Sequence, residues 1–275
     1  MDVRCCDGLK LLETVKDGSV DLILTDPPYI ISHDTGMNTL RNAIDSGVDL
    51  TRTEEEWVAY TSENPVAQTT PHAKENYMKY GTIYGKKYSV KTNYGTWDEQ
   101  FTMEDMERFI ESYYKKLRDG GTCIIFFDLW KVSHLKELME KHKFKQIRFI
   151  EWVKTNPQPI NSKVNYLTNA REIALLGVKK GKPTFHGAYD NGIYQYPIQG
   201  GKNRVHPTQK NLKLFEDVIK KHSNEGDLVV DTFLGGGTTA LAAKNTGRRC
   251  VGSELDKTYF ENIQKILDES STPVD

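Results

Sequence analysis

The chain is poor in cysteine, with four in 275 residues, and their spacing forms no regular framework. Cys5 and Cys6 are adjacent, whereas Cys123 and Cys250 lie far apart in apolar segments. Neither a disulfide scaffold nor a zinc-binding pattern has this arrangement. We therefore interpret Cys123 and Cys250 as core residues and give no cysteine a catalytic role. We also expect no metal, because no group of His, Cys or acidic residues has metal-ligand spacing.

Long apolar runs are also missing. No segment approaches the ~18 apolar residues that cross a bilayer, and the N-terminus MDVRCCDGLK has no apolar signal region. We expect a cytoplasmic protein with no membrane association. The net charge is only −1, with 37% hydrophobic and 27% charged residues, so the chain is not basic throughout. Its length suits one large α/β domain or two small ones.

The charge is unevenly distributed despite this balance. Between residues 131 and 182 there are twelve lysines and arginines but only four glutamates. A neutral protein with a basic middle can hold a polyanion along one face. The alternative is a solvated helix face with scattered lysines.

Apolar runs alternate with amphipathic stretches, which is typical of a parallel sheet flanked by helices. We expect strands at 20–25, 122–127, 149–154, 172–178, 228–231 and 249–253. We expect helices at 103–117, 133–141, 210–222, 238–245 and 257–267. The prediction is therefore an α/β fold in a single domain of residues 1–275.

Two segments interrupt the alternation. Residues 31–97 form a long polar insertion with one expected helix near 53–60, and residues 181–205 form a short stretch rich in Gly and Tyr. The second half of the insertion interleaves tyrosines with lysines, which suits phosphate contact and base stacking; these residues are Tyr77, Lys79, Tyr80, Tyr84, Lys86, Lys87, Tyr88, Lys91 and Tyr94. A lid or packing insert without a role in nucleic-acid binding is the alternative.

Residues 227–256, DLVVDTFLGGGTTALAAKNTGRRCVGSELD, read as strand, glycine-rich turn, helix and strand. Asp231 ends the first strand, and the glycines from Gly235 to Gly237 let the backbone approach a ligand closely. Thr238 then opens a helix whose amides face that ligand. Glu254 follows the second strand, where an acid can hold ribose hydroxyls. The segment therefore predicts an adenosine-binding unit.

Three cofactor classes use such a unit. A phosphate-binding P-loop is excluded, because it needs a lysine just before the Ser or Thr. A dinucleotide site of a dehydrogenase fits the loose pattern Gly235-x-Gly237-x-x-Ala240. S-adenosylmethionine also fits, since its middle is uncharged and requires no pyrophosphate-binding loop.

A second unusual feature is LILTDPPYI, residues 22–30, where an apolar strand runs into two prolines. Prolines cannot donate to a sheet, so pairing must stop at Asp26. The resulting corner offers a carboxylate and a fixed carbonyl as acceptors. Two acceptors on one amine can localise its lone pair, which is orientational and electrostatic catalysis. A strand-terminating turn is the alternative.

Together these motifs resemble the β group of DNA amino-methyltransferases. The catalytic motif stands as Asp26-Pro27-Pro28-Tyr29 and the cofactor motif as Phe233-Leu234-Gly235-Gly236-Gly237, in the chain order of that group. HPTQK, residues 206–210, matches the segment before the cofactor strand, with Asn211 in place of the usual proline. EWVKTNPQP (151–159) and YGTWDEQF (94–101) resemble the branch that methylates adenine in short asymmetric sites.

The resemblance implies a Rossmann-like methyltransferase fold and methyl transfer from S-adenosylmethionine to the N6 of an adenine flipped from a specific DNA sequence. In the catalytic motif, Asp26 and the Pro27 carbonyl accept hydrogen bonds from the amine, Pro28 makes the corner rigid, and Tyr29 stacks on the base. The implied cofactor-binding residues are Asp7, His206, Thr208, Lys210, Asp231, Phe233, Gly235, Gly237, Thr238 and Glu254. Helix capping is the alternative for Asp7, Thr208 and Lys210, and we interpret Trp152 and Lys154 as core and surface residues.

The implied partner is double-stranded DNA, with single-stranded DNA as an alternative. The resemblance also implies a homodimer and either a cognate restriction endonuclease or orphan modification. We expect residues 31–97 to be a DNA-contacting lid and residues 181–205 to recognise the target. The alternative functions are an N4-cytosine DNA methyltransferase, a catalytically silent DNA-binding subunit and an NAD-binding dehydrogenase.

Overall fold

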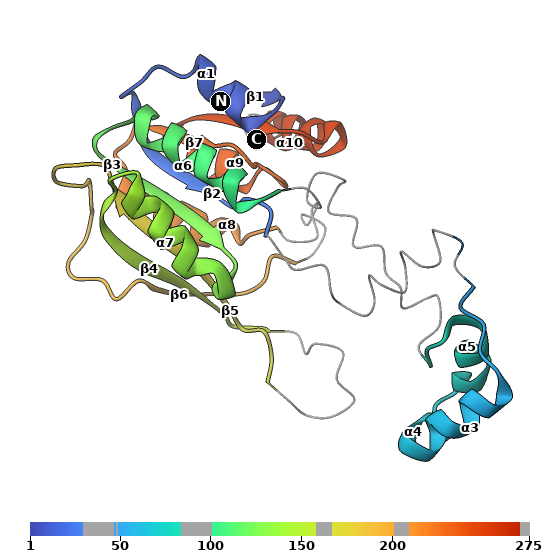
Figure 1. The fold of residues 1–275 in the computed structure, drawn as a ribbon. Coiled ribbons are helices and arrows are strands. Elements are labelled where there is room, and N and C mark those ends of the chain that lie inside the picture. The colour runs from blue at the N-terminus through green and yellow to red at the C-terminus, as the bar shows by residue number, and fades with distance from the viewer. Residues whose placement is uncertain (30–46, 48, 84–100, 158–166, 201–208, 270–275) are drawn as a thin grey trace. The chain divides into compact units, whose positions relative to one another are not determined.

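The computed structural model describes residues 1–29, 47, 49–83, 101–157, 167–200 and 209–269. The chain divides into two compact units (Figure 1). One comprises residues 1–30 and 98–275, and we call it the sheet unit; the other comprises residues 31–97, and we call it the insertion unit. Within the described residues, no helix has the length and apolarity needed to cross a membrane.

In the part of the sheet unit that the structure describes, eight strands form one sheet. Their order across the sheet is β1 (Asp2–Cys5), β8 (Arg249–Glu254), β7 (Leu228–Asp231), β2 (Val20–Thr25), β3 (Leu117–Phe127), β5 (Arg171–Val178), β4 (Lys145–Lys154) and β6 (Ile193–Tyr196). Neighbours from β1 to β3 are parallel, β5 is antiparallel to both of its neighbours, and β6 is parallel to β4. The predicted α/β fold with a mostly parallel sheet is confirmed.

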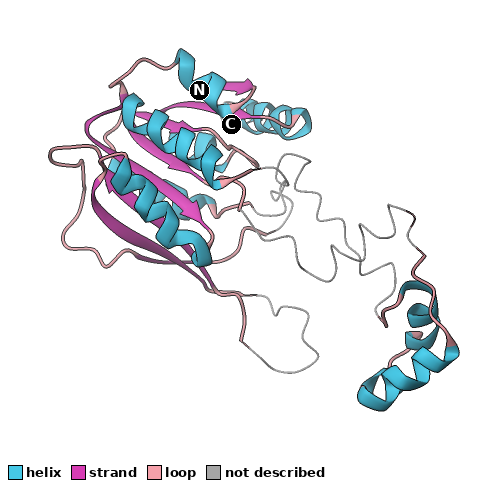
Figure 2. Cartoon of the chain, in the orientation of Figure 1, coloured by secondary structure: helices cyan, strands magenta, loops and turns pink. Residues whose placement is uncertain are grey.

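Helices cover both faces of this sheet, as Figure 2 shows. One core contains side chains of α1 (Gly8–Thr14), α6 (Met103–Lys116) and α7 (Val132–Lys141). The other contains side chains of α8 (Leu212–His222), α9 (Thr238–Asn245) and α10 (Lys257–Glu269). Because strand side chains alternate between faces, Leu22 and Leu24 enter the second core and Ile23 the first. This double burial explains why β2 reads as a continuous apolar run.

Several element boundaries differ from those predicted. β3 begins at Leu117, five residues before the predicted start, because α6 passes into the strand without a loop. α8 begins at Leu212 because Asn211 caps it, with its Oδ1 accepting a hydrogen bond from the Leu214 amide at 3.1 Å. Two four-residue strands, β1 and β6, were not predicted; β6 lies within residues 181–205 and extends the sheet next to β4.

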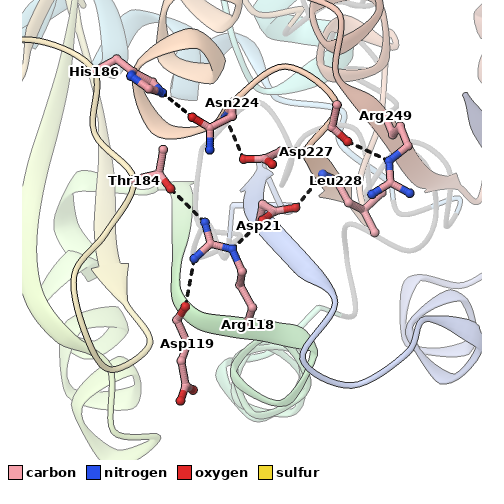
Figure 3. Close-up of polar contacts among 10 residues, drawn as sticks. Asp21, Arg118, Asp119, Thr184, His186, Asn224, Asp227, Leu228 and Arg249 are labelled. Atoms are coloured by element: carbon pink, nitrogen blue, oxygen red, sulfur yellow. Dashed lines mark hydrogen bonds and ion pairs between the residues drawn. The ribbon is translucent and has the colours of Figure 1, made fainter.

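A polar network ties the amino ends of three neighbouring strands together (Figure 3). Asp21 of β2 pairs with Arg118 Nε of β3 at 2.5 Å and accepts a hydrogen bond from the Leu228 amide of β7 at 2.8 Å. Arg118 Nη2 also donates to Thr184 Oγ1 at 2.9 Å. These contacts hold the amino ends of β7, β2 and β3 together. The predicted site residues lie at the opposite edge, at the carboxyl ends of these strands.

The insertion unit contains α3 (Glu54–Glu63), α4 (Val66–Thr69) and α5 (Ala73–Tyr80). The helix expected near residues 53–60 is therefore present, and it starts with a capping box between Thr53 and Glu56. The three helices share a small core of their own, consisting of Trp57, Ala67, Ala73 and Ile83, with Tyr60, Tyr77 and Met78 packed against it.

The described part of the insertion unit is acidic. Residues 49–83 contain six acidic and three basic side chains. Tyr77, which the sequence offered as a stacking residue, packs on Tyr60 with ring centroids 4.6 Å apart. That ring therefore serves this unit's own core. The other predicted stacking and phosphate-contacting residues from 84 to 94 lie outside the described residues.

Candidate active site

The Asp-Pro-Pro-Tyr corner lies at the carboxyl end of β2, between β7 and β3. In open α/β sheets, ligands bind at this edge. Pro27 and Pro28 are buried and Tyr29 is half-buried. The Tyr29 ring lies 6.4 Å from the ring of Phe127, the last residue of β3, at an angle of 58°. The corner is thus held between two central strands.

The two carboxylate oxygens of Asp26 have different surroundings. Oδ2 lies 2.7 Å from Lys210 Nζ, whereas Oδ1 is buried without a hydrogen-bond partner among the described residues. Burial raises the pKa of Asp26 to about 6; Lys210 counteracts this rise, while Glu172 and Asp231 add to it. The corner therefore presents one acceptor oxygen, desolvated and available, on an acid that ionises near neutral pH.

Lys210 is almost enclosed, with 6% of its surface exposed. Its Nζ contacts Asp26 Oδ2 and Glu172 Oε2, each at 2.7 Å, and lies 3.5 Å from the Tyr29 hydroxyl. The second oxygen of Glu172, Oε1, pairs with Lys154 Nζ at 2.8 Å. Four charged groups thus alternate in sign, and we call Asp26, Lys210, Glu172 and Lys154 the ion-pair chain.

This arrangement changes two interpretations made from the sequence and confirms a third. Lys210 does not cap α8, because Asn211 does so; a contact between Lys210 and the cofactor stays a prediction. The expectation that Lys154 lies on the surface is wrong, since only 12% of its side chain is exposed. Trp152 is a core residue, as expected, with 1% exposed.

The glycine-rich turn follows β7 at the same edge of the sheet. Gly235 has φ +52°, and a Cβ there would meet no atom of the described residues within 4 Å. Gly237 has φ +77° and caps α9; a Cβ there would lie 2.9 Å from Ile263 Cγ1. Glycine is therefore required at Gly237 by packing and conformation, and at Gly235 by conformation with open space above it.

Glu254 lies beside this turn, at the end of β8. It is 3% exposed, its Oε2 accepts a hydrogen bond from the Gly235 amide at 2.7 Å, and its Oε1 accepts one from the Asp256 amide at 2.8 Å. Burial raises its pKa, and these backbone hydrogen bonds counteract the rise. Each carboxylate oxygen keeps a second lone pair, so Glu254 can still accept hydrogen bonds from a ligand.

Asp231 braces the two motifs against each other. Its Oδ1 accepts hydrogen bonds from Thr25 Oγ1 at 2.7 Å and the Phe233 amide at 2.9 Å, and its Oδ2 accepts one from Thr239 Oγ1 at 2.5 Å. Burial raises the pKa of this carboxyl, while these hydrogen bonds oppose the rise. Asp231 therefore ties the end of β2, one residue before Asp26, to the glycine-rich turn and α9.

Two further predicted cofactor residues also support the turn. The Phe233 ring packs against Phe109, with centroids 4.7 Å apart, and edge-on against Phe101 at 5.6 Å. Thr238 Oγ1 donates to the carbonyl of Lys210 at 3.4 Å, so the start of α9 touches the residue that pairs with Asp26. The turn and the catalytic corner are therefore joined by both Asp231 and Lys210.

The remaining predicted residues divide into two groups. Asp7 caps α1, with its Oδ1 accepting from the amides of Leu9 at 2.9 Å and Lys10 at 3.2 Å. Asp7 therefore does cap a helix, as the alternative interpretation expected. A contact between Asp7 and a cofactor stays a prediction. His206 and Thr208 lie outside the described residues.

The residues present fit the predicted cofactor. Open space lies over Gly235, and the Glu254 carboxylate is within hydrogen-bonding distance of that same residue. α9 begins three residues later, at Thr238. A ribose bound here could contact the Glu254 carboxylate and the glycine backbone of the turn, as an adenosine site requires. The structured segments hold no set of three or more His, Cys, Asp or Glu side chains that could bind a metal ion.

Sequence reasoning did not select Glu172, which pairs with the buried Lys210 and the half-buried Lys154. A signal was nevertheless available, because Glu172 begins the apolar stretch IALLGV, and a charged side chain in a central strand requires a partner. The identity of that partner depends on the tertiary fold, since residues 26, 154, 172 and 210 are distant in the chain.

Comparison with known proteins places this site in a family. A family model described as DNA methylase matches residues 20–265. The chain is 26% identical to the Type II methyltransferase M2.LlaDCHI of Lactococcus lactis subsp. cremoris, covering 97% of this chain and 88% of that protein. It is 27% identical to the Type II methyltransferase M2.DpnII of Streptococcus pneumoniae, covering 95% and 87%.

Solved structures share the fold. The crystal structure of the M1.HpyAVI–SAM complex aligns with a TM-score of 0.60 at 24% identity, covering 96% of this chain and 98% of that one. The PvuII DNA methyltransferase, described as cytosine-N4-specific, aligns with a TM-score of 0.63 at 17% identity, covering 95% and 84%. At these identities the alignments establish a common architecture.

Proposed function

The chain belongs to the DNA methylase family, in the β group of S-adenosylmethionine-dependent DNA amino-methyltransferases, and from that membership we propose that it methylates the N6 amine of adenine in a specific DNA sequence. The observation that carries this proposal is Asp26 Oδ1, a buried acceptor without a partner among the described residues, at the start of the Asp-Pro-Pro-Tyr corner. An exocyclic amine is the kind of donor that such an oxygen would bind.

The corner would activate the amine by orientation. The lone pair of an exocyclic amine is delocalised into the ring, and two acceptors on its hydrogens draw the nitrogen toward tetrahedral geometry. Asp26 Oδ1 is one acceptor, and the Pro27 carbonyl, with its direction fixed by the two prolines, is the second. Tyr29 would stack on the flipped base and offset part of the few kcal/mol that flipping costs. S-adenosylmethionine, when bound, supplies the electrophilic methyl group on its sulfonium.

The glycine-rich turn would hold the cofactor. Glu254 accepts hydrogen bonds from the ribose hydroxyls, Gly235 leaves room for the ligand, Gly237 lets the turn pack on Ile263, and Thr238 begins the helix beside it. Asp231 fixes the turn to β2, since its oxygens accept three hydrogen bonds from the protein, and its contact with the cofactor stays a prediction.

Adenine rather than cytosine is supported by EWVKTNPQP and YGTWDEQF, which resemble the adenine branch. The test is incubation of the purified protein with labelled S-adenosylmethionine and mixed-sequence double-stranded DNA, followed by nucleoside analysis. We expect N6-methyladenine. Label on cytosine N4 would instead support the N4-cytosine alternative, and label only on RNA or protein would contradict a DNA substrate.

Substitution of Asp26 tests the site itself. Asp26→Ala removes the acceptor, and we expect a loss of about 10²–10³-fold in the rate of methyl transfer, as for other groups aimed at a reacting atom. The matched control is Asp128→Ala, because Asp128 follows the neighbouring strand β3 and caps a short 3-10 turn. Equal rates for Asp26→Ala and the unmodified protein would contradict this catalytic role, whereas methylation by neither protein would support the silent-subunit alternative.

Family membership does not favour the dehydrogenase alternative. The DNA substrate follows from the family, whereas a preference for double strands, a homodimer and a cognate restriction endonuclease stay predictions. Mapping methylation across a host genome with and without this chain would identify the recognition sequence and show whether modification depends on a neighbouring endonuclease.

A further inference from the structure

Among the described residues, Glu172 is the second acid, besides Asp26, that pairs with Lys210. It lies in β5, opposite Trp152 of β4, so its backbone is fixed by the sheet. Its two oxygens bind two different lysines, Lys210 at 2.7 Å and Lys154 at 2.8 Å. We propose that Glu172, anchored by Lys154, is a positioning residue that holds the Lys210 ammonium on Oδ2 of Asp26 and so keeps Oδ1 open for the substrate amine. This inference rests on the proposed function.

The geometry explains why a third group is needed. An ammonium has three N–H donors that point in different directions, so a lysine can serve more than one acceptor. With Asp26 alone, Lys210 could lie between both carboxylate oxygens and compete with the amine for Oδ1. Glu172 draws the ammonium to one side, and the rings of Tyr29 and Phe126, with centroids 5.4 and 5.5 Å from Nζ, limit its movement.

The charges of the chain also support this role. Although burial opposes its ionisation, Lys210 and Lys154 hold the pKa of Glu172 below its ordinary value. Burial would lower the pKa of Lys210, but Asp26, Tyr29 and Glu172 raise it well above the ordinary value. Both groups therefore stay charged throughout the pH range in which Asp26 titrates, so their effect on Asp26 is constant.

The groups facing Asp26 act in opposite directions. Lys210 favours the ionised carboxylate, while burial and the negative charges of Glu172 and Asp231 disfavour it; the Tyr29 phenol stays neutral because burial raises its pKa well above its usual range. Removing the charge of Lys210 must therefore raise the pKa of Asp26, and removing the charge of Glu172 must lower it. A contact that carries no charge would not produce these opposite shifts, and the rate of methyl transfer then separates positioning from the effect of charge alone.

The test is the pH dependence of single-turnover methyl transfer, because that rate reports chemistry rather than product release. For the unmodified protein we expect the rate to rise with pH through a midpoint near 6, as Asp26 ionises. Lys210→Met should move the midpoint up by about 1–3 pH units. Glu172→Gln should move it down by about one pH unit and lower the plateau about tenfold, a loss typical of removing a group that orients a reacting residue.

Glu216→Gln is the matched control. Glu216 is a buried glutamate that also pairs with a lysine, Lys213 at 2.8 Å, but it lies on α8 outside the ion-pair chain. We expect its midpoint and plateau to equal those of the unmodified protein. Lys210→Arg keeps the positive charge, so the midpoint of its pH profile should stay close to that of the unmodified protein. This variant keeps the charge effect testable if Lys210→Met folds poorly.

A second measurement is independent of turnover. The carboxyl carbons of ¹³C-labelled aspartate report the pKa of Asp26 in the protein alone, with Asp26→Asn used for assignment. The same order of pKa values is expected: Lys210→Met highest and Glu172→Gln lowest. Coincident pKa values in Glu172→Gln and the unmodified protein, or a Glu172→Gln plateau equal to that of the control, would overturn the positioning role. Absence of DNA methylation by the unmodified protein would overturn the proposed function instead, while the titration would still test the charge coupling.

Discussion

Gly226 and Gly235 are similar glycines at opposite ends of β7. Both have a positive φ, +80° and +52°, and at neither would a Cβ meet an atom of the described residues within 4 Å. An alanine at either position should cost about 1–2 kcal/mol of backbone strain. Only Gly235 touches Glu254, through its amide at 2.7 Å. The pair therefore separates the cost of strain from the cost of filling the cofactor site.

We predict that Gly235→Ala weakens binding of S-adenosylhomocysteine by about tenfold or more, because one methyl group placed where a ligand must fit costs about 1–3 kcal/mol. Gly226→Ala should bind it as tightly as the unmodified protein. Both variants should lose similar stability to urea. Isothermal titration calorimetry measures the affinity, and equal affinities for the two variants would show that the ligand does not lie over Gly235.

Individual residues also show where sequence reasoning stops. Asp26 and Glu254 could be selected because motif and position agree: an acid at the carboxyl end of a strand, next to prolines or after a glycine-rich turn. Asp231 was selected for a cofactor contact, whereas its two oxygens accept hydrogen bonds from Thr25, Phe233 and Thr239. One of these partners, Thr25, lies 206 positions from Asp231, and no local pattern encodes that contact.

At the scale of the elements, the Asp21–Arg118 pair ties β2 to β3 at the edge of the sheet away from the site (Figure 3). Arg118→Met would leave the Asp21 carboxylate, 15% exposed, without this partner. We predict a loss of about 1–3 kcal/mol in the free energy of unfolding, because one oxygen of a half-buried carboxylate loses its charged hydrogen-bond partner. Affinity for S-adenosylhomocysteine should not change, because the cofactor turn lies at the carboxyl ends of the strands.

The control for Arg118→Met is Arg4→Met. Arg4 pairs with Asp2 at 2.6 Å, but both side chains are more than 40% exposed. Exposed pairs contribute about 0–1 kcal/mol. Urea unfolding of the two variants compares the pairs directly. If Arg118→Met loses no more stability than Arg4→Met, the network at this edge does not hold the strands together.

The elements that were predictable carry strong local signals. β2 and β7 are apolar runs that end at an acid, and α9 begins after a glycine turn, so their limits match those predicted. β1 and β6 are short and partly exposed, with burial alternating too weakly to be recognised. Such strands form because the sheet offers them a partner: β8 for β1 and β4 for β6.

At the scale of the whole molecule, the chain contains separate cores. The described core residues of the sheet unit come from residues up to 29 and from 101 onward, and the insertion unit's core comes from residues 57–83. Separate cores mean that folding of the sheet unit does not depend on burial within the insertion unit. The insertion is thus free to serve recognition, and the prediction that it is a DNA-contacting lid can be tested by removing it.

Replacing residues 31–97 with a Gly/Ser linker of about 20 residues, which spans about 25 Å on average, should leave cooperative unfolding and S-adenosylhomocysteine binding intact. We predict that sequence-specific DNA methylation is lost. Trp57→Ala, which removes the largest side chain of the insertion unit's core, should reduce methylation in the full-length chain without changing S-adenosylhomocysteine affinity. Methylation of the same sites by the shortened chain would contradict the lid. Loss of S-adenosylhomocysteine binding would instead show that the insertion is needed to build the cofactor site, and the two units would then depend on each other despite their separate cores.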